Sequence, residues 1–269
     1  MFNKGYPRIY FIGIVAIVLA AVISLAGPVY AVIPLGLFIT LCLASPFLPG
    51  WQMFLISVMQ GDKDMNGVAI TFDDGPAPET TPVILEMLNR HGIKATFFVI
   101  GEKAVLYPEL IRNIIENGHA IGNHTMSHDV FIMLKSQARL EKEITGCQGV
   151  LADFNVQTLV FRPPAGIVNP RLGPILSQLG LFCVMFSRRG KDFGNRRIDK
   201  ISRNILKGVK GGDIIMLHDR APGQNAPVSE LIRQMEETIA GIGKKGLAFL
   251  PLEKLIGRKV MEGLWRKEK

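Results

Sequence analysis

The sequence predicts an α/β fold, a (β/α) barrel of seven or eight units, that follows an apolar N-terminal anchor. No Asp, Glu, Lys or Arg occurs in residues 9–61, although these residues make up 20% of the 269-residue chain. From residue 68 onward, short apolar runs alternate with amphipathic ones, the pattern of βαβ units around a parallel sheet. The number of units suits a barrel better than an open sheet with a second domain, but the pattern leaves both open.

The charge-free segment is too long for one membrane helix, which needs about 20 apolar residues. Two helices fit, over 9–26 and 29–48, with Gly27-Pro28 between them. The alternative is a cleaved signal peptide, because Ser24-Leu25-Ala26 resembles a cleavage site, but the second run would still remain as an anchor. We therefore expect a membrane anchor over residues 1–61 and one globular domain over residues 62–269.

Lys4 and Arg8 precede the first apolar run, which favours a cytoplasmic N-terminus. Two spans would return the domain to the cytoplasm, whereas one or three would place it outside. Two spans are favoured because the next apolar segment, residues 51–59, is too short to cross a bilayer. The expected location is the cell membrane, multi-pass, with the cytoplasmic side favoured for the domain.

The elements of the domain follow from apolar runs bounded by glycine and proline. Helices are expected to end at Gly92 and Gly118, where a left-handed residue stops them. The expected strands cover 68–72, 95–100, 119–121, 158–161, 182–186, 213–217 and 247–250. The expected helices cover 80–90, 102–117, 135–151, 171–179, 198–207 and 228–242.

Two adjacent carboxylates, Asp73 and Asp74, close the first strand, directly before Gly75-Pro76. Neighbouring strand residues normally point to opposite faces, so two such side chains would not share a site. At a strand end where the chain turns, both can reach one cleft. The alternative is that Asp-Gly-Pro is ordinary turn chemistry.

His124 and His128 are two of the chain's five histidines and lie four residues apart. On one helical turn, side chains at this spacing face the same way and can hold one ion. With a carboxylate from another strand end they would form a set of two histidines and one carboxylate, which leaves coordination positions open for catalysis.

Three further polar residues lie near strand ends. Arg162 follows one predicted strand and is either a surface cation or the partner of a carboxylate. Asp192 lies in the loop after the next strand, and His218 ends a buried strand. Catalytic groups belong at the carboxyl ends of parallel strands.

Together these segments resemble the polysaccharide deacetylase family (carbohydrate esterase family 4) over residues 64–252. The resemblance is carried by Thr-Phe-Asp-Asp-Gly-Pro at 71–76, His-Thr-x-x-His at 124–128, Arg-Pro-Pro-x-Gly at 162–166 and Leu-His at 217–218. It implies a distorted (β/α) barrel and a divalent metal, usually Zn²⁺ with Co²⁺, Mn²⁺ or Ni²⁺ as alternatives. The residues that it implies as metal ligands are Asp74, His124 and His128.

The same resemblance implies Asp73 as general base, Arg162 as its partner, His218 as general acid and Asp192 as the residue that orients this histidine. It also implies a substrate-binding wall that includes Pro164, Phe193 and Leu217. Two positions depart from the family. Arg189 stands where many relatives have Asp, and Phe193 stands where they have Trp. These two positions lie on the wall of the expected substrate groove and not at the metal. The departures therefore affect which substrate is bound more than which reaction is catalysed.

The resulting expectation is a metal-dependent hydrolase that removes N-acetyl groups from an amino sugar in a polysaccharide or lipid-linked glycan. An O-acetyl esterase and a catalytically inactive, membrane-tethered carbohydrate-binding scaffold are the alternatives. Expected partners are the glycan and membrane lipid. A net charge of +8 could indicate nucleic acid, but no recognition motif accompanies it. A basic cluster over 188–203 is either a solvated loop or a contact for phosphate.

Overall fold

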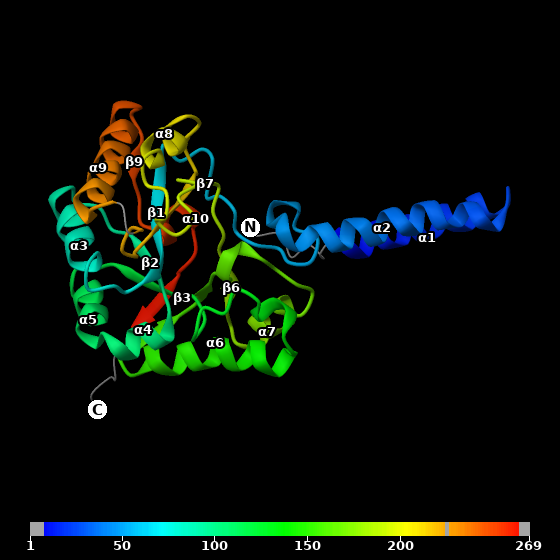
Figure 1. Cartoon of the computed structure of the whole chain (residues 1–269), viewed down its shortest axis with the longest axis horizontal. Helices are drawn as coiled ribbons and strands as arrows, with labels where there is room; N and C mark the ends of the chain where they lie inside the picture. Colours follow the sequence, from blue (N-terminus) through cyan, green and yellow to red (C-terminus); the bar gives the residue numbers. More distant parts are fainter. Residues whose placement is uncertain (1–7, 224–225, 264–269) are drawn as a thin grey trace.

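The computed structural model describes residues 8–223 and 226–263. Its centre is one curled sheet of eight parallel strands, with helices packed around the outside (Figure 1). The strands of this sheet are β1 (Gly67–Gly75), β2 (Thr96–Val99), β3 (Ala120–Asn123), β5 (Val160–Phe161), β6 (Phe182–Cys183), β7 (Arg188–Arg189), β8 (Ile214–His218) and β9 (Ala248–Phe249). The helices of the domain are α3 (Thr81–Arg90), α4 (Gly101–Leu106), α5 (Pro108–Glu116), α6 (Gln137–Ala152), α7 (Leu172–Gln178), α8 (Ile201–Leu206), α9 (Val228–Lys244) and α10 (Leu252–Ile256).

The strand order is β6-β5-β3-β2-β1-β8-β7, with β9 also paired to β1. The sheet curls into a half-barrel whose two edge strands, β6 and β7, do not pair with each other. The predicted distorted (β/α) barrel is confirmed in this form. A separate antiparallel pair joins β4 (Val156–Thr158) to β10 (Met261–Gly263), and the sequence patterns did not predict it.

Buried apolar residues at helical or strand spacing explain most of the elements. All nine residues of β1 are buried, as a central strand covered on both faces requires. The amphipathic helix α9 turns Leu231, Met235, Ile239 and Ile242 toward the sheet. The predicted helix over 102–117 is divided into α4 and α5, because Pro108 cannot continue the hydrogen bonds of the preceding turn.

Two apolar helices, α1 (Arg8–Ser24) and α2 (Val32–Ala44), lie side by side and project away from the domain (Figure 1). Within the described residues, one stretch is long and apolar enough to cross a membrane, the 20-residue segment Pro28–Phe47 around α2. The 17 residues of α1 fall short of that length. The structure therefore supports one candidate membrane span, around α2. The predicted span over 9–26, and with it the multi-pass arrangement, is not supported. Lys4, used to predict orientation, lies outside the described residues.

The segment that leaves these helices enters the open side of the half-barrel. Val58 pairs with Val184 just after β6, donating its backbone N–H to Cys183 O and accepting from Met185 N, both at 2.9 Å. Gln60 bridges to Asp213, just before β8, and its Nε2 donates to the buried carboxylate at 2.9 Å. The linker therefore contacts both sides of the gap that the sheet leaves open.

These contacts lead us to expect that a domain beginning at residue 62 is less stable than one beginning at residue 53. The shorter protein loses four hydrogen bonds, including one from Gly61 N to Gly212 O, and the side chains of Met53 and Phe54, which are buried in the full chain. At ~1 kcal/mol for each hydrogen bond, the free energy of unfolding should fall by roughly 4 kcal/mol before the apolar loss is added. Urea denaturation of the two truncated proteins measures this difference, and equal midpoints would show that the linker adds nothing to the barrel.

Candidate active site

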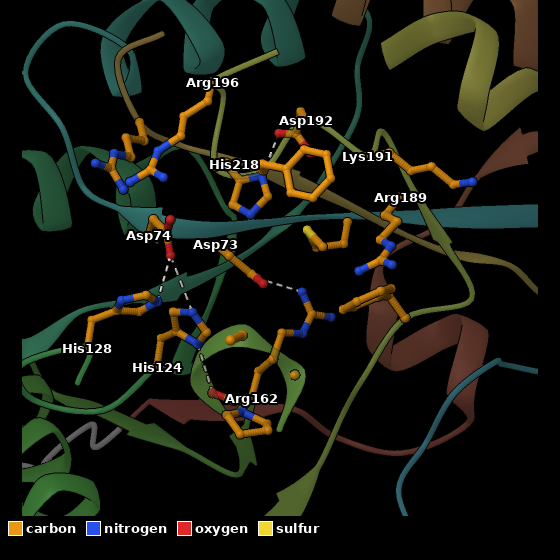
Figure 2. Close-up of a pocket in the computed structure, with 18 residues that line it drawn as sticks. Asp73, Asp74, His124, His128, Arg162, Arg189, Lys191, Asp192, Arg196 and His218 are labelled. Carbon is orange, nitrogen blue, oxygen red and sulfur yellow. Dashed lines mark hydrogen bonds and ion pairs between the residues drawn. The ribbon is translucent and has the colours of Figure 1, made fainter. Parts of the chain in front are cut away.

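The two carboxylates at the end of β1 point into one cavity because the strand is irregular there. The pairing register with β2 shifts between Phe72 and Gly75, and Asp74 has a φ of 71°, in the left-handed region. Such a bulge re-aims one side chain. Gly75 is required for close approach, since a Cβ there would lie 2.4 Å from an oxygen of Asp219. Figure 2 shows Asp73 and Asp74 side by side in the cavity.

Asp74 lies against the two histidines that the sequence singled out. Its Oδ1 is 3.0 Å from His128 Nε2 and 3.4 Å from His124 Nε2, and one ligand atom from each residue lies within 4.8 Å of the others. The expected helical turn is wrong. The segment is a loop with positive φ at Thr125 and His128, and His128 N donates to Thr125 Oγ1 at 3.1 Å. The loop, rather than a helix, brings the two rings together.

His124 is held from outside the trio. Its Nδ1 is 2.7 Å from the carbonyl oxygen of Arg162, a contact that orients the ring with Nε2 toward Asp74. Burial by itself raises the pKa of the Asp74 carboxyl. The hydrogen bonds and positive charges of His124 and His128 outweigh burial and hold that pKa far below its usual range. Asp74 is therefore an anion.

Asp73 has a different partner, the guanidinium of Arg162, which is only 1% exposed. Arg162 Nη1 donates to Asp73 Oδ1 at 2.6 Å and to Thr71 Oγ1 at 2.8 Å. Its Nε donates to Val184 O and its Nη2 to Met185 O. The guanidinium thus joins β1 to the segment after β6. Because the guanidinium is planar and its other donors are occupied, it holds the carboxylate of Asp73 in place.

His218 ends β8, in register with Asp73 on the neighbouring strand. Its Nδ1 is 2.6 Å from Oδ2 of the buried Asp192, so its Nε2 is directed toward the cavity (Figure 2). Burial lowers the pKa of His218, but the hydrogen bond to Asp192 and the negative charges of Asp192, Asp74 and Asp73 together raise it above its usual value.

The loop that carries Asp192 is held in an unusual backbone conformation. Lys191, Phe193 and Asn195 all have φ between 52° and 61°. Asn195 compensates for this strain, since its Nδ2 donates to the carbonyl of His218 at 3.0 Å and its backbone N–H donates to Asp192 Oδ2 at 3.3 Å. Nothing in the sequence pattern pointed to Asn195.

These groups line a cavity of about 520 Å³ at the carboxyl ends of the strands. Of the three residues expected on the substrate wall, Phe193 lines it and is 69% exposed. Leu217 does not, because side chains alternate along β8 and Leu217 faces the core while Met216 and His218 face the cavity. Pro164 is buried and does not line the cavity, although its neighbours Pro163 and Ala165 do.

The cavity also has a basic wall. Besides Arg162, it is lined by the cations Arg189, Lys191, Arg196 and Arg220. Arg189 was noted in the sequence as a departure on the groove wall. Lys191 and Arg196 were noticed only as members of a basic cluster, and Arg220 was missed, although its place two residues after His218 at a strand end was an available signal.

Comparisons with known proteins show which proteins the chain resembles in sequence and in fold. The sequence profile of the family described as polysaccharide deacetylase matches residues 60–184. The chain is 32% identical over 191 residues to a peptidoglycan-N-acetylglucosamine deacetylase of Bacillus cereus, covering 70% of this chain and 87% of that protein. It is 33% identical over 182 residues to a chitooligosaccharide deacetylase of Azorhizobium caulinodans, covering 67% of this chain and 86% of that protein.

Among solved structures, the fold matches a peptidoglycan N-acetylglucosamine deacetylase crystallised with 4-naphthalen-1-yl-N-oxidanyl-benzamide. The TM-score is 0.69 at 29% identity, and the match covers 76% of this chain and 94% of that one. The sequence relationship extends over most of the Bacillus cereus protein, and the half-barrel is shared with the solved structure. The chain therefore belongs to the polysaccharide deacetylase family.

Proposed function

We propose that this chain is a divalent-metal-dependent hydrolase that removes N-acetyl groups from an amino sugar of a polysaccharide or lipid-linked glycan. The observation that carries the proposal is the convergence of Asp74, His124 and His128 beside a buried Asp73 and a His218 in register with it. Support also comes from the relatives named above, which are deacetylases of peptidoglycan N-acetylglucosamine and of chitooligosaccharides.

The trio of Asp74, His124 and His128 fits a divalent cation by the chemistry of its donors. It offers two imidazole nitrogens and one carboxylate oxygen from separate segments, the mixed set that suits Zn²⁺ and leaves positions open for substrate. The contact of His124 Nδ1 with the Arg162 carbonyl is the outer support typical of a ligating histidine. A cation held there supplies Lewis acidity to the acyl carbonyl.

Asp73 is suited to act as general base toward the attacking water. Arg162 occupies Asp73 Oδ1 and fixes the carboxylate, and the second oxygen remains to accept the water proton. The permanent charge of Arg162 pairs with this carboxylate at 2.6 Å, and the Asp73 side chain is buried at the base of the cavity. The new C–O bond forms as this proton moves to Asp73.

His218 is suited to act as general acid toward the departing nitrogen. Asp192 binds the Nδ1 proton, so Nε2 carries the proton that can be donated into the cavity. As the C–N bond breaks, this proton passes to the nitrogen, and the products are acetate and a free amino group on the sugar. An O-acetyl ester would instead release a free hydroxyl group.

We further propose that the segment Pro28–Phe47 attaches the enzyme to a membrane. A second cavity of about 420 Å³, almost entirely apolar, lies where this segment meets the domain and is lined by Phe47 and Phe131 among others. Phe131 and Leu134, on the domain side, are 63% and 79% exposed. An apolar surface continuous with an apolar helix is typical of a face that rests on lipid.

The reaction is tested by incubating the full chain, loaded with Zn²⁺, with an N-acetylated chitooligosaccharide and with peptidoglycan fragments. We expect release of acetate together with new primary amino groups, measured by mass spectrometry and amine labelling. Acetate without new amines from an O-acetylated glycan would establish the esterase instead. A protein that binds these glycans but releases no acetate would be the inactive scaffold.

Asp73→Asn should abolish turnover while metal stays bound. Asn keeps the shape of the side chain but cannot take a proton, and a general base contributes about 10²–10⁴ in rate. The exposed Asp153→Asn, outside the cavity, is the matched control. Acetate release and metal content of both variants measure the effect, and near-normal deacetylation by Asp73→Asn would remove Asp73 from the role of base.

His124→Ala should lose the metal itself, because it removes one of the three converging donors. His91→Ala, an exposed histidine outside the cavity, should keep it. Elemental analysis of the purified proteins after dialysis checks this expectation. A His124→Ala protein that retains as much metal as the control would contradict the ligand assignment.

Asp192→Asn should move the basic limb of the pH profile of kcat/KM to lower pH. An acid works only while protonated, so activity falls as pH rises through the pKa of His218, and Asp192 raises that pKa. Asp199→Asn, exposed in the same basic segment, controls for a general change of charge. If both variants leave the basic limb unmoved, His218 is not the acid that limits activity.

A further inference from the structure

The cavity holds more positive charge than its own acids neutralise. Each of its three carboxylates already has a partner: Asp73 is bound by Arg162, Asp192 by His218, and Asp74 by the two histidines. The four other cations of its lining are Arg189, Lys191, Arg196 and Arg220. None of these four has an acidic partner in the part of the chain that the structure describes.

Some exposed cations elsewhere on the domain are paired with acids, whereas others, such as Lys142, Lys207 and Lys245, have no acidic partner among the described residues. Arg90 pairs with Glu236, Arg112 with Glu109, and Lys259 with Glu262. Even Arg188, next to Arg189, is neutralised by the buried carboxylate of Asp213 at 3.0 Å. What distinguishes the cavity is that four cations without an acidic partner among the described residues share one lining, where like charges repel one another unless an anion joins them.

The cations surround the place where a substrate would lie. Figure 2 shows Arg189 and Lys191 on one side of Asp73, and Arg196 on the other side above Asp74. Arg220 is close to Asp74 as well, since a Cβ at Gly194 would lie 3.6 Å from Asp74 Oδ2 and 3.7 Å from Arg220 Nη1. The guanidinium of Arg189 also lies 5.9 Å from the centre of the Phe186 ring, a contact that limits its motion.

We propose that the natural substrate of this cavity is an N-acetylated amino sugar that carries a phosphate group, and that Arg189, Lys191, Arg196 and Arg220 bind this phosphate. Guanidinium groups bind phosphate oxygens through paired hydrogen bonds, and lysine adds a point charge. A neutral glycan would use none of these four charges. The inference rests on the proposed deacetylase function and specifies its substrate class.

The phosphate has two possible sources, a soluble sugar phosphate or a sugar joined through phosphate to a membrane lipid. The test therefore uses three matched substrates: triacetylchitotriose, its 1-phosphate, and the alkyl ester of that 1-phosphate. The enzyme is the full chain loaded with Zn²⁺ in nanodiscs of neutral lipid. Acetate release gives kcat/KM for each.

We expect kcat/KM to be at least ~10-fold higher for the phosphorylated trisaccharides than for the neutral one, as one charge-assisted contact provides. The advantage should shrink as ionic strength rises. A greater advantage for the alkyl ester identifies the lipid-linked source, and equal values for the two phosphates identify the soluble one. Equal kcat/KM for all three overturns this inference but leaves the deacetylase intact, whereas no acetate from any of them overturns the proposed function.

Variants test the residues themselves. In Arg189→Gln and Arg196→Gln, the ratio of kcat/KM between phosphorylated and neutral trisaccharide should fall toward one. Arg203→Gln removes the same charge from α8, outside the cavity lining, and should keep the wild-type ratio. If all three variants change the ratio equally, the effect is a general one of net charge and the proposed site is wrong.

Binding without catalysis gives a second readout. Glucose 1-phosphate, which has no acetyl group, is titrated by calorimetry into the metal-free full chain, so that neither turnover nor phosphate–metal contact contributes. We expect binding that weakens about tenfold or more in the double variant Arg189→Gln/Arg196→Gln and is unchanged in Arg203→Gln. Equal binding to wild type and double variant would overturn the assignment.

Discussion

The site depends on the buried pair between Arg162 and Asp73. The guanidinium is almost fully buried, and its donors reach Thr71 and Asp73 on β1 and the backbone of Val184 and Met185 after β6. Removing one partner of such a pair leaves an uncompensated buried charge, which typically costs about 3–5 kcal/mol. The same residue also orients His124 through its carbonyl oxygen. One arginine thereby positions both the carboxylate proposed as general base and one histidine proposed as a metal ligand.

Two neighbouring carboxylates acquire different properties because they have different partners. Asp73 faces a permanent cation that fixes it. Asp74, turned by its positive φ, faces two imidazoles that hold its pKa low and complete the proposed ligand set. A regular strand would have placed these side chains on opposite faces of the sheet. The irregular end of β1 is therefore what allows the proposed base and the proposed ligand to share one cavity.

The apolar N-terminal segment is tied closely to this site. Val58 pairs with the backbone around Val184, which in turn accepts a hydrogen bond from Arg162. The linker that follows the apolar helices and the guanidinium beside the proposed base therefore bind the same stretch of backbone after β6.

The sequence by itself determined the fold class, and it singled out the polar residues that meet in the cavity, because strand ends in an α/β fold place scattered polar residues at one edge. Their proposed roles as ligands, base and acid came from the resemblance to a known family. It misjudged how His128 reaches the site, since a loop and a helical turn can share the same i, i+4 spacing. Only the tertiary structure decided that Leu217 faces the core and that Asn195 holds the Asp192 loop. It alone decided that four cations without acidic partners among the described residues gather at one cavity, because charge balance depends on contacts between distant segments.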